Sequence, residues 1–302
     1  MSFNDDVQLD TSQVEAGGRG GFGGGGGMML GGGLGGGGLL LVVVLSLLGV
    51  INPSSLLGGG GNGAQPGVAP DPAVSSSCRT GADANRDVRC RVVGTVNSVQ
   101  DFWAEELPRN GVRYRPARTT LYSGQTQSAC GTASNAVGPF YCPTDGKVYI
   151  DASFFDELTT RFGADDGALA QEYVVAHEYG HHVQDLLGVL GAAQSDAQGA
   201  TSGSVRVELQ ADCYAGMWAR GAASTEDAQG RTYLKPLTRQ DIASALSAAS
   251  AVGDDRIQSQ AGGRADPESY THGTSAQRQR WFTVGYQYGD LDRCDTLHAS
   301  SL

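Results

Sequence analysis

The pattern of hydrophobic and polar positions divides the chain into helical and extended segments. Apolar residues recur at helical spacing, which predicts helices at residues 98–107, 153–162, 166–190, 205–221, 239–251 and 274–288. Short runs rich in β-branched residues predict strands at 91–96, 112–115 and 147–151, the last being the clearest. Few short strands among many helices indicate an α+β domain with a small sheet.

The first 77 residues do not follow this pattern. Residues 1–16 are polar and acidic, and sixteen of the 46 glycines lie in residues 17–38. Such a stretch buries too little apolar surface to fold by itself, so residues 1–27 are predicted to form a disordered tail. Residues 52–77 are rich in Pro, Gly and Ser, so they are predicted to form a linker. The folded domain is therefore expected at residues 78–302.

Between tail and linker lies an apolar run at residues 39–51, which ends at Asn52-Pro53. Counted back to Met28 it gives 24 residues without a charge, enough for the ~20 residues that cross a bilayer. A signal peptide and a buried core helix are the alternatives, but no basic cluster precedes the run. We predict a single transmembrane helix at residues 28–51, with the lipid bilayer as a partner. Arg19 before the run favours a position outside the cytoplasm for the C-terminal bulk of the chain.

Charge and cysteine content limit the class of protein further. A net charge of −11 without clustered Lys or Arg argues against nucleic-acid binding. No cysteine lies in a C-x-x-C pattern, and the first four form two pairs twelve positions apart, which favours disulfides over a zinc ribbon. Free buried thiols in a cytosolic protein are the alternative. The disulfide candidates are Cys78, Cys90, Cys130, Cys142, Cys213 and Cys294.

One helical segment carries metal-binding chemistry. His177 and His181 are four residues apart, so they project from one face of a helix and can share a metal ion. Neutral imidazoles suit Zn²⁺, which lowers the pKa of a bound water towards ~7. Glu178 lies at the edge of that face, where a general base would stand. A pair of exposed helix histidines beside a carboxylate is the simpler alternative.

A catalytic zinc site needs a third protein ligand. Glu208 and Asp212 are again four apart, in a segment whose neighbours are largely apolar, so they are expected to have partners. We assign Glu208 as the third ligand. Asp212 is expected to accept the N–H of a ligand histidine and so orient its ring.

These motifs resemble a known family. His-Glu-x-x-His followed by Glu-x-x-Ala-Asp is similar to the gluzincin type of metallopeptidase. Together with the stretches at 77–79, 90–97, 138–143, 177–184, 208–216 and 271–278, the glycine-rich leader and Cys294-Asp295-Thr296, they resemble the bacterial putative neutral zinc metallopeptidase family over nearly the whole chain. The resemblance implies a zincin-like fold, a Zn²⁺ cofactor, a membrane tether and hydrolysis of a peptide or protein substrate.

Carried onto this sequence, the resemblance assigns His177, His181 and Glu208 to zinc, Glu178 to general base and Asp212 to their support. His272 is the leading candidate for the residue that stabilises the oxyanion, ahead of Tyr173 and Tyr270. His182 is expected to be a hydrogen-bonding or surface residue, and His298 to play no part. Residues 147–151 are expected to form an edge strand that pairs with substrate.

Two other functions compatible with these residues are considered. One is a non-catalytic binding module at the cell surface with a structural zinc, which the presence of Glu178 disfavours. The other is a zinc amidase acting on cell-wall peptides, which would use the same metal chemistry.

Overall fold

A computed structural model describes residues 3–17, 72–134 and 137–302 of the chain. The helices are α2 (Pro72–Ser77), α3 (Gly81–Ala84), α4 (Val88–Arg109), α5 (Phe154–Thr160), α6 (Ala168–Leu187), α7 (Gly191–Ser195), α8 (Gly203–Gly221), α9 (Arg239–Ala251), α10 (Asp254–Gln260) and α11 (Ser275–Tyr288), with 3-10 turns η1 (Thr11–Gln13), η4 (Pro267–Ser269) and η5 (Leu291–Cys294). The strands are β1 (Val14–Ala16), β2 (Arg118–Tyr122), β3 (Gln125–Ser128), β4 (Gly131–Ser134), β5 (Phe140–Cys142) and β6 (Lys147–Asp151).

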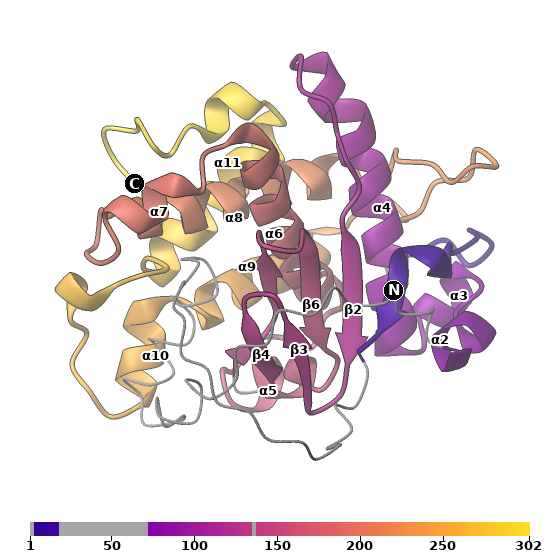
Figure 1. Cartoon of the computed structure of the whole chain (residues 1–302), viewed down its shortest axis with the longest axis horizontal. Coiled ribbons are helices and arrows are strands. Elements are labelled where there is room, and N and C mark those ends of the chain that lie inside the picture. The colour runs from indigo at the N-terminus through magenta and orange to yellow at the C-terminus, as the bar shows by residue number, and fades with distance from the viewer. Residues whose placement is uncertain (1–2, 18–71, 135–136) are drawn as a thin grey trace, which may run out of the picture.

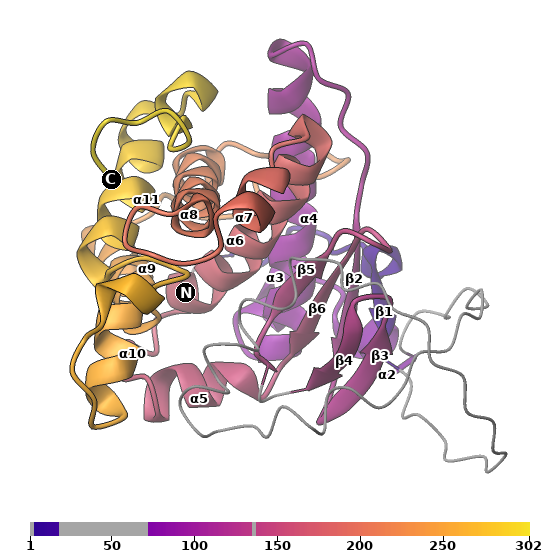
Figure 2. The same cartoon turned by 60° about the vertical axis from the view of Figure 1, so that its left-hand side comes forward.

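The strands form a four-stranded sheet in the order β1-β2-β6-β5 and a separate β3–β4 hairpin. β1, β2 and β6 are parallel, and β5 runs antiparallel to β6. Helix α6 joins the sheet to the helical half, because it contacts β5 and β6 on one side and α8 and α9 on the other. Figures 1 and 2 show this arrangement, with α8, α9 and α11 gathered on the side away from the sheet. The predicted α+β class is confirmed.

Helices α8 and α11 pack at very short range because each presents a glycine to the other. A Cβ built on Gly285 would lie 1.8 Å from the carbonyl oxygen of Cys213, and one on Gly216 would lie 2.1 Å from that of Phe282. Neither position can take a larger residue without separating the helices. This contact fixes α11 against the helix that carries Glu208.

The N-terminal residues are part of the folded domain, which corrects the predicted disordered tail. Strand β1 pairs with β2, and Phe3, Val7 and Val14 are fully buried. The Phe3 ring occupies the space beside Gly94, where a Cβ would approach it to 2.7 Å. Two hydrogen bonds reinforce the docking. Asn97 Oδ1 of α4 accepts the Asp10 N–H at 2.8 Å, and Asn97 Nδ2 donates to the Asp10 carbonyl at 2.9 Å. The polar composition of residues 3–17 therefore concealed three core side chains.

The predicted transmembrane helix is also corrected. Residues 28–51 lie outside the described residues, and none of the described helices is long and apolar enough to cross a membrane. The longest of these, α4, α6 and α8, each carry at least three charged side chains. Moreover, β1 and β2 pair although they flank the segment, and a single crossing would put them on opposite sides of a bilayer. The predicted single-pass membrane anchoring is therefore wrong, and the localisation that was drawn from it is not supported.

Most of the predicted elements of the domain are found within a few residues of their expected ends. The exceptions are the helix predicted at 98–107, which begins ten residues earlier as α4, the strand predicted at 91–96, which lies inside α4, and the strand predicted at 112–115, which forms no element. Residues 92–96 are buried on all sides, so the valines showed no helical period and suggested a strand. Strand β6 is in the sheet interior, between β2 and β5, so the predicted edge strand is wrong in position; β5 is the edge on that side.

The disulfide prediction is confirmed for all six cysteines. Cys78 bonds Cys90 and Cys130 bonds Cys142, both across a sequence separation of 12, whereas Cys213 bonds Cys294 across 81 residues. The long bridge ties the C-terminal segment to α8.

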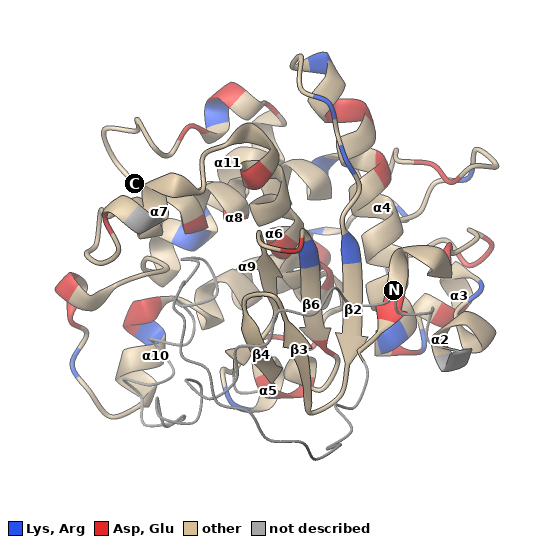
Figure 3. Ribbon diagram, in the orientation of Figure 1, with Lys and Arg blue, Asp and Glu red and all other residues tan. Residues whose placement is uncertain are grey.

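Charged residues of both signs are interspersed along the elements in Figure 3, and the absence of nucleic-acid binding stays a prediction.

Candidate metal centre

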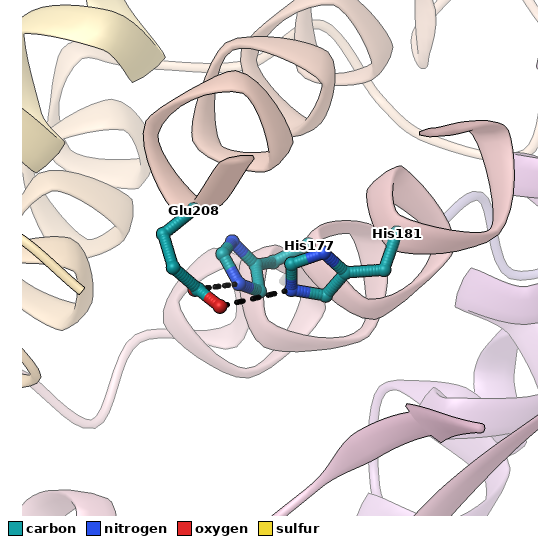
Figure 4. Close-up of side chains that lie close together, drawn as sticks. All are labelled: His177, His181 and Glu208. Atoms are coloured by element: carbon teal, nitrogen blue, oxygen red, sulfur yellow. Dashed lines mark hydrogen bonds and ion pairs between the residues drawn. The ribbon is translucent and has the colours of Figure 1, made fainter. Parts of the chain in front are cut away.

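The centre forms where α6 and α8 cross. Gly188, in a left-handed conformation with φ of +73°, caps the C-terminus of α6, and Ser202, whose hydroxyl accepts the Val205 N–H, caps the N-terminus of α8. Gly180 allows the close crossing, because a Cβ there would lie 3.0 Å from the Cα and carbonyl oxygen of Ala211. The crossing brings Glu208 opposite the two histidines of α6, as Figure 4 shows.

His177, His181 and Glu208 present one ligand atom each within 4.8 Å of one another, a group able to hold a metal ion. The Nε2 atom of His177 lies 3.1 Å from Glu208 Oε2, and that of His181 lies 3.5 Å from Oε1 (Figure 4). Ligands about 2.0–2.1 Å from a tetrahedral zinc are about 3.3 Å apart. The two separations from Glu208 are close to this value, so the donor set of two imidazoles and one carboxylate fits a zinc ion.

The electrostatics of the centre favour a cation. Burial alone would lower the pKa of His177, but the carboxylates of Asp212 and Glu208 outweigh it and raise the pKa to about 9. Burial would likewise raise the pKa of Glu208, yet the surrounding histidines hold it well below its usual value. A proton on His177 thus marks a site of negative potential, in which a metal ion would replace the proton.

Asp212 supports His177 as the sequence predicted, and the structure adds a residue that the sequence reasoning missed. The Nδ1 atom of His177 lies 2.9 Å from Asp212 Oδ1. Arg278 of α11, itself buried, donates to Asp212 through Nε at 2.8 Å and through a terminal nitrogen at 2.9 Å. The sequence did contain a signal for Arg278, namely an arginine within a helix predicted to pack in the core, because a buried charge needs a partner.

The Tyr173 hydroxyl, considered for the oxyanion role, is bonded to the support of His177. It donates to Asp212 Oδ1 in a short hydrogen bond, and Arg278 contacts the same oxygen of Tyr173 at 3.2 Å. The side chain is buried, and its hydroxyl is bonded to Asp212 and Arg278. Tyr270 is also buried, and its carbonyl accepts the N–H of Gly199.

Glu178 lies beside the ligands. It is 6% exposed, and burial raises the pKa of its carboxyl, although His177 and His181 offset part of the effect. A carboxylate that is held at a higher pKa is a better proton acceptor. The group is thus placed next to the candidate metal position without being one of the three converging ligands.

His272 lies in a loop that one carboxylate organises. Asp254 Oδ2 accepts the backbone N–H groups of Thr271, His272 and Gly273 at 2.7–3.0 Å. The Thr271 hydroxyl lies 2.8 Å from His272 Nδ1. Burial alone would lower the pKa of His272, but Glu208 and Asp254 outweigh it and raise the pKa. The interaction with Glu208 shows that the imidazole lies within electrostatic reach of the centre.

The two remaining histidines lie away from these ligands. His182 is buried and bonds the Tyr141 hydroxyl at 3.2 Å and the Arg115 carbonyl at 2.6 Å, as expected of a hydrogen-bonding residue. His298 is exposed in the C-terminal segment and contacts only Asp295 among the described side chains. Neither contacts the three converging ligands.

Comparisons with known proteins give one consistent result. A family described as putative neutral zinc metallopeptidase matches residues 5–297. The uncharacterized protein Rv2575 of Mycobacterium tuberculosis is 58% identical over 228 residues, 75% of this chain and 76% of its own. The uncharacterized protein YpfJ of Escherichia coli K12 is 44% identical over 208 residues, 67% and 69% of the two chains. No solved structure matched.

Proposed function

Since this chain belongs to the family of putative neutral zinc metallopeptidases, we propose that it is a zinc-dependent peptidase that hydrolyses peptide bonds. The observation that carries the proposal is the convergence of His177, His181 and Glu208 from two helices, with Glu178 next to them and outside the ligand set. A purely structural zinc has four protein ligands and needs no base.

Each residue of the centre has a separate task. His177, His181 and Glu208 would hold the zinc ion, which would supply the Lewis acidity for activating a water and the scissile carbonyl. Glu178 takes the proton from the attacking water and passes it to the nitrogen of the leaving amine. His272, whose Nδ1 is engaged by Thr271, offers Nε2 as a hydrogen-bond donor to the oxygen on which negative charge develops.

Replacing the base tests the proposal. Glu178→Gln keeps the size of the side chain and removes its proton affinity, so it should retain about one zinc per chain and lose turnover on a peptide library. Glu105→Gln, on the exposed part of α4, is the control and should cleave at the unaltered rate. Cleavage by Glu178→Gln at the control rate would contradict the base assignment. Zinc binding without cleavage by the unaltered chain would instead support a binding module.

The oxyanion role of His272 has its own test. His272→Ala should lower kcat by about 100- to 1,000-fold, the usual loss for one such donor, and change KM much less. His298→Ala, at an exposed histidine, is the control. Equal kcat values for the two variants would remove His272 from the mechanism. Cleavage of cell-wall peptides in place of linear peptides would point to the amidase alternative.

Strand β5 is the part of the sheet that we infer pairs with an extended substrate. It has β6 on one side and no second strand partner within the described parts of the chain, and its Tyr141 hydroxyl donates to Asp185 of α6 at 2.8 Å. Backbone pairing at such an edge binds a peptide through its amides. Peptides N-methylated at successive amides should therefore show a raised KM at alternate positions. A KM unchanged at every position would exclude pairing at β5.

A further inference from the structure

A line of side-chain amides links His181 to the C-terminal segment. His181 Nδ1 lies 2.8 Å from Gln184 Oε1. Gln184 Nε2 donates to Gln210 Oε1 at 3.0 Å, and Gln210 Nε2 donates to the carbonyl of Cys294 at 3.1 Å. Both glutamines are buried, with 0% and 5% of their surface exposed. Buried amides in series leave few alternative arrangements.

Backbone carbonyls fix the direction of each amide. A carbonyl only accepts, so the group of Gln210 that faces Cys294 must be its NH₂, and its oxygen must face Gln184. Gln184 Nε2 also donates to the carbonyl of Val207 at 2.7 Å, which fixes this amide in the same sense. The oxygen of Gln184 therefore faces His181, and Nδ1 must carry the proton. His181 is left with a bare Nε2, the atom that faces Glu208.

The far end of this hydrogen-bond line is held by a disulfide and by hydrogen bonds from an arginine. Cys294 is joined to Cys213 of α8, and both are fully buried. Earlier on α8, Arg206 donates to the carbonyls of Thr296 and Ala299 at 2.6 and 3.0 Å. The Cys294 carbonyl is therefore fixed relative to the helix that carries Glu208.

We propose that Gln184 is a positioning residue that holds His181 in the tautomer and orientation needed to bind zinc, and that Gln210 and the disulfide-tethered Cys294 carbonyl hold Gln184 in turn. The inference rests on the proposed function only in taking His181 as a zinc ligand. It makes the Cys213–Cys294 crosslink part of the support of the metal centre, unlike the Cys78–Cys90 crosslink, which lies between α2 and α4.

Zinc affinity tests the line of hydrogen bonds. Gln184→Met keeps the length of the side chain and removes its hydrogen bonds, and it should weaken zinc binding by about 10- to 100-fold. Gln210→Met should weaken it less, since Gln184 retains the Val207 carbonyl. Gln100→Met is the control, because Gln100 is a buried glutamine that bonds Gln13 and Tyr114 instead. The dissociation constant is measured on the full chain by competition with a chelator.

The disulfide is tested by the same measurement. Cys213→Ser with Cys294→Ser should weaken zinc binding, and Cys78→Ser with Cys90→Ser should leave it within about twofold of the unaltered chain, as expected for a change that touches no supporting residue. Equal losses in the two double variants would overturn the role given to the Cys294 carbonyl. Zinc affinity in Gln184→Met equal to that of the Gln100→Met control would overturn the proposal as a whole.

A measurement on the unaltered protein covers the case in which a variant does not fold. Nitrogen-15 NMR of the zinc-free full chain at mildly alkaline pH should show His181 protonated on Nδ1, and Nδ1 without a proton would overturn the proposal. Neither readout needs hydrolysis. A chain that binds zinc tightly and cuts no peptide would end the proposed function and leave this inference standing.

Discussion

The buried pair of Arg278 and Asp212 allows the most direct test of how the centre is supported. Arg278→Met removes the guanidinium and keeps much of the apolar stem. Asp212 is fully buried, and its Oδ2 accepts a hydrogen bond from Arg278 Nε at 2.8 Å, so in the variant this carboxylate stays in the core without the guanidinium and keeps only His177 as a cationic neighbour. Removing one partner of a buried ion pair costs about 3–5 kcal/mol of unfolding free energy. With a urea dependence of roughly 3 kcal/mol per M, the unfolding midpoint should fall by about 1–1.7 M.

The assay is urea unfolding of the zinc-free chain followed by circular dichroism. The control is Arg231→Met, since Arg231 pairs with Asp227 at 2.9 Å but keeps 31% of its side chain exposed. Such a partly solvated pair contributes about 0–1 kcal/mol. Losses of similar size in Arg278→Met and Arg231→Met would refute the reasoning, because they would mean that Asp212 finds other stabilisation in the core.

The same pair predicts how the stability difference between the variant and the unaltered protein changes with pH. Burial alone would raise the pKa of Asp212, but Arg278 and His177 outweigh it and lower the pKa. Because the pKa of Asp212 is lower in the folded than in the unfolded chain, where it is near 3.9, the carboxylate stabilises the fold at pH values above 3.9. This stabilisation is lost as the pH falls through the pKa of the folded state. In Arg278→Met the pKa of Asp212 should instead rise. The difference in stability between the two proteins should therefore be largest near neutral pH and shrink in acid; a difference that grows in acid would contradict this account.

Two further predictions concern the architecture. Phe3→Ala should lower the unfolding free energy by about 3–5 kcal/mol in urea titrations, because the ring is fully buried against Gly94; a disordered N-terminus would give no change. Removing the Cys213–Cys294 bridge should cost about 1.7 kcal/mol more than removing Cys78–Cys90, from the ratio of the 81- and 12-residue separations in the chain-entropy relation. Equal losses in calorimetry would show that loop length does not govern these bridges.

The sequence predicted the centre better than it predicted the topology. His177, Glu178 and His181 are related by the geometry of one helix, so their spacing was enough to place them on a common face. Arg278 and Gln184 were not found, because what distinguishes each is a partner on another helix. The strand expected at 91–96 failed for a related reason, since a helix buried all round shows no amphipathic period.

The first 17 residues show most plainly what could not be predicted from the sequence. Their composition is that of a disordered tail, yet Phe3, Val7 and Val14 are fully buried. Those side chains gain stability only because α4 and β2 provide the surface that buries them, at Gly94 and along the strand edge. The same docking overturns the single transmembrane helix, which hydropathy favoured because it counts apolar residues without regard to where the flanking segments pack.

The sequence by itself thus determined the helices, the face that carries the two histidines and the presence of three disulfide bridges, because periodicity and residue type act over a few positions. Only the tertiary structure decided how α8 crosses α6 to bring Glu208 to the two histidines, which strand lies at the sheet edge and which amides orient His181. Those features depend on contacts between segments tens to hundreds of residues apart, and a local pattern states which face is buried but not against what.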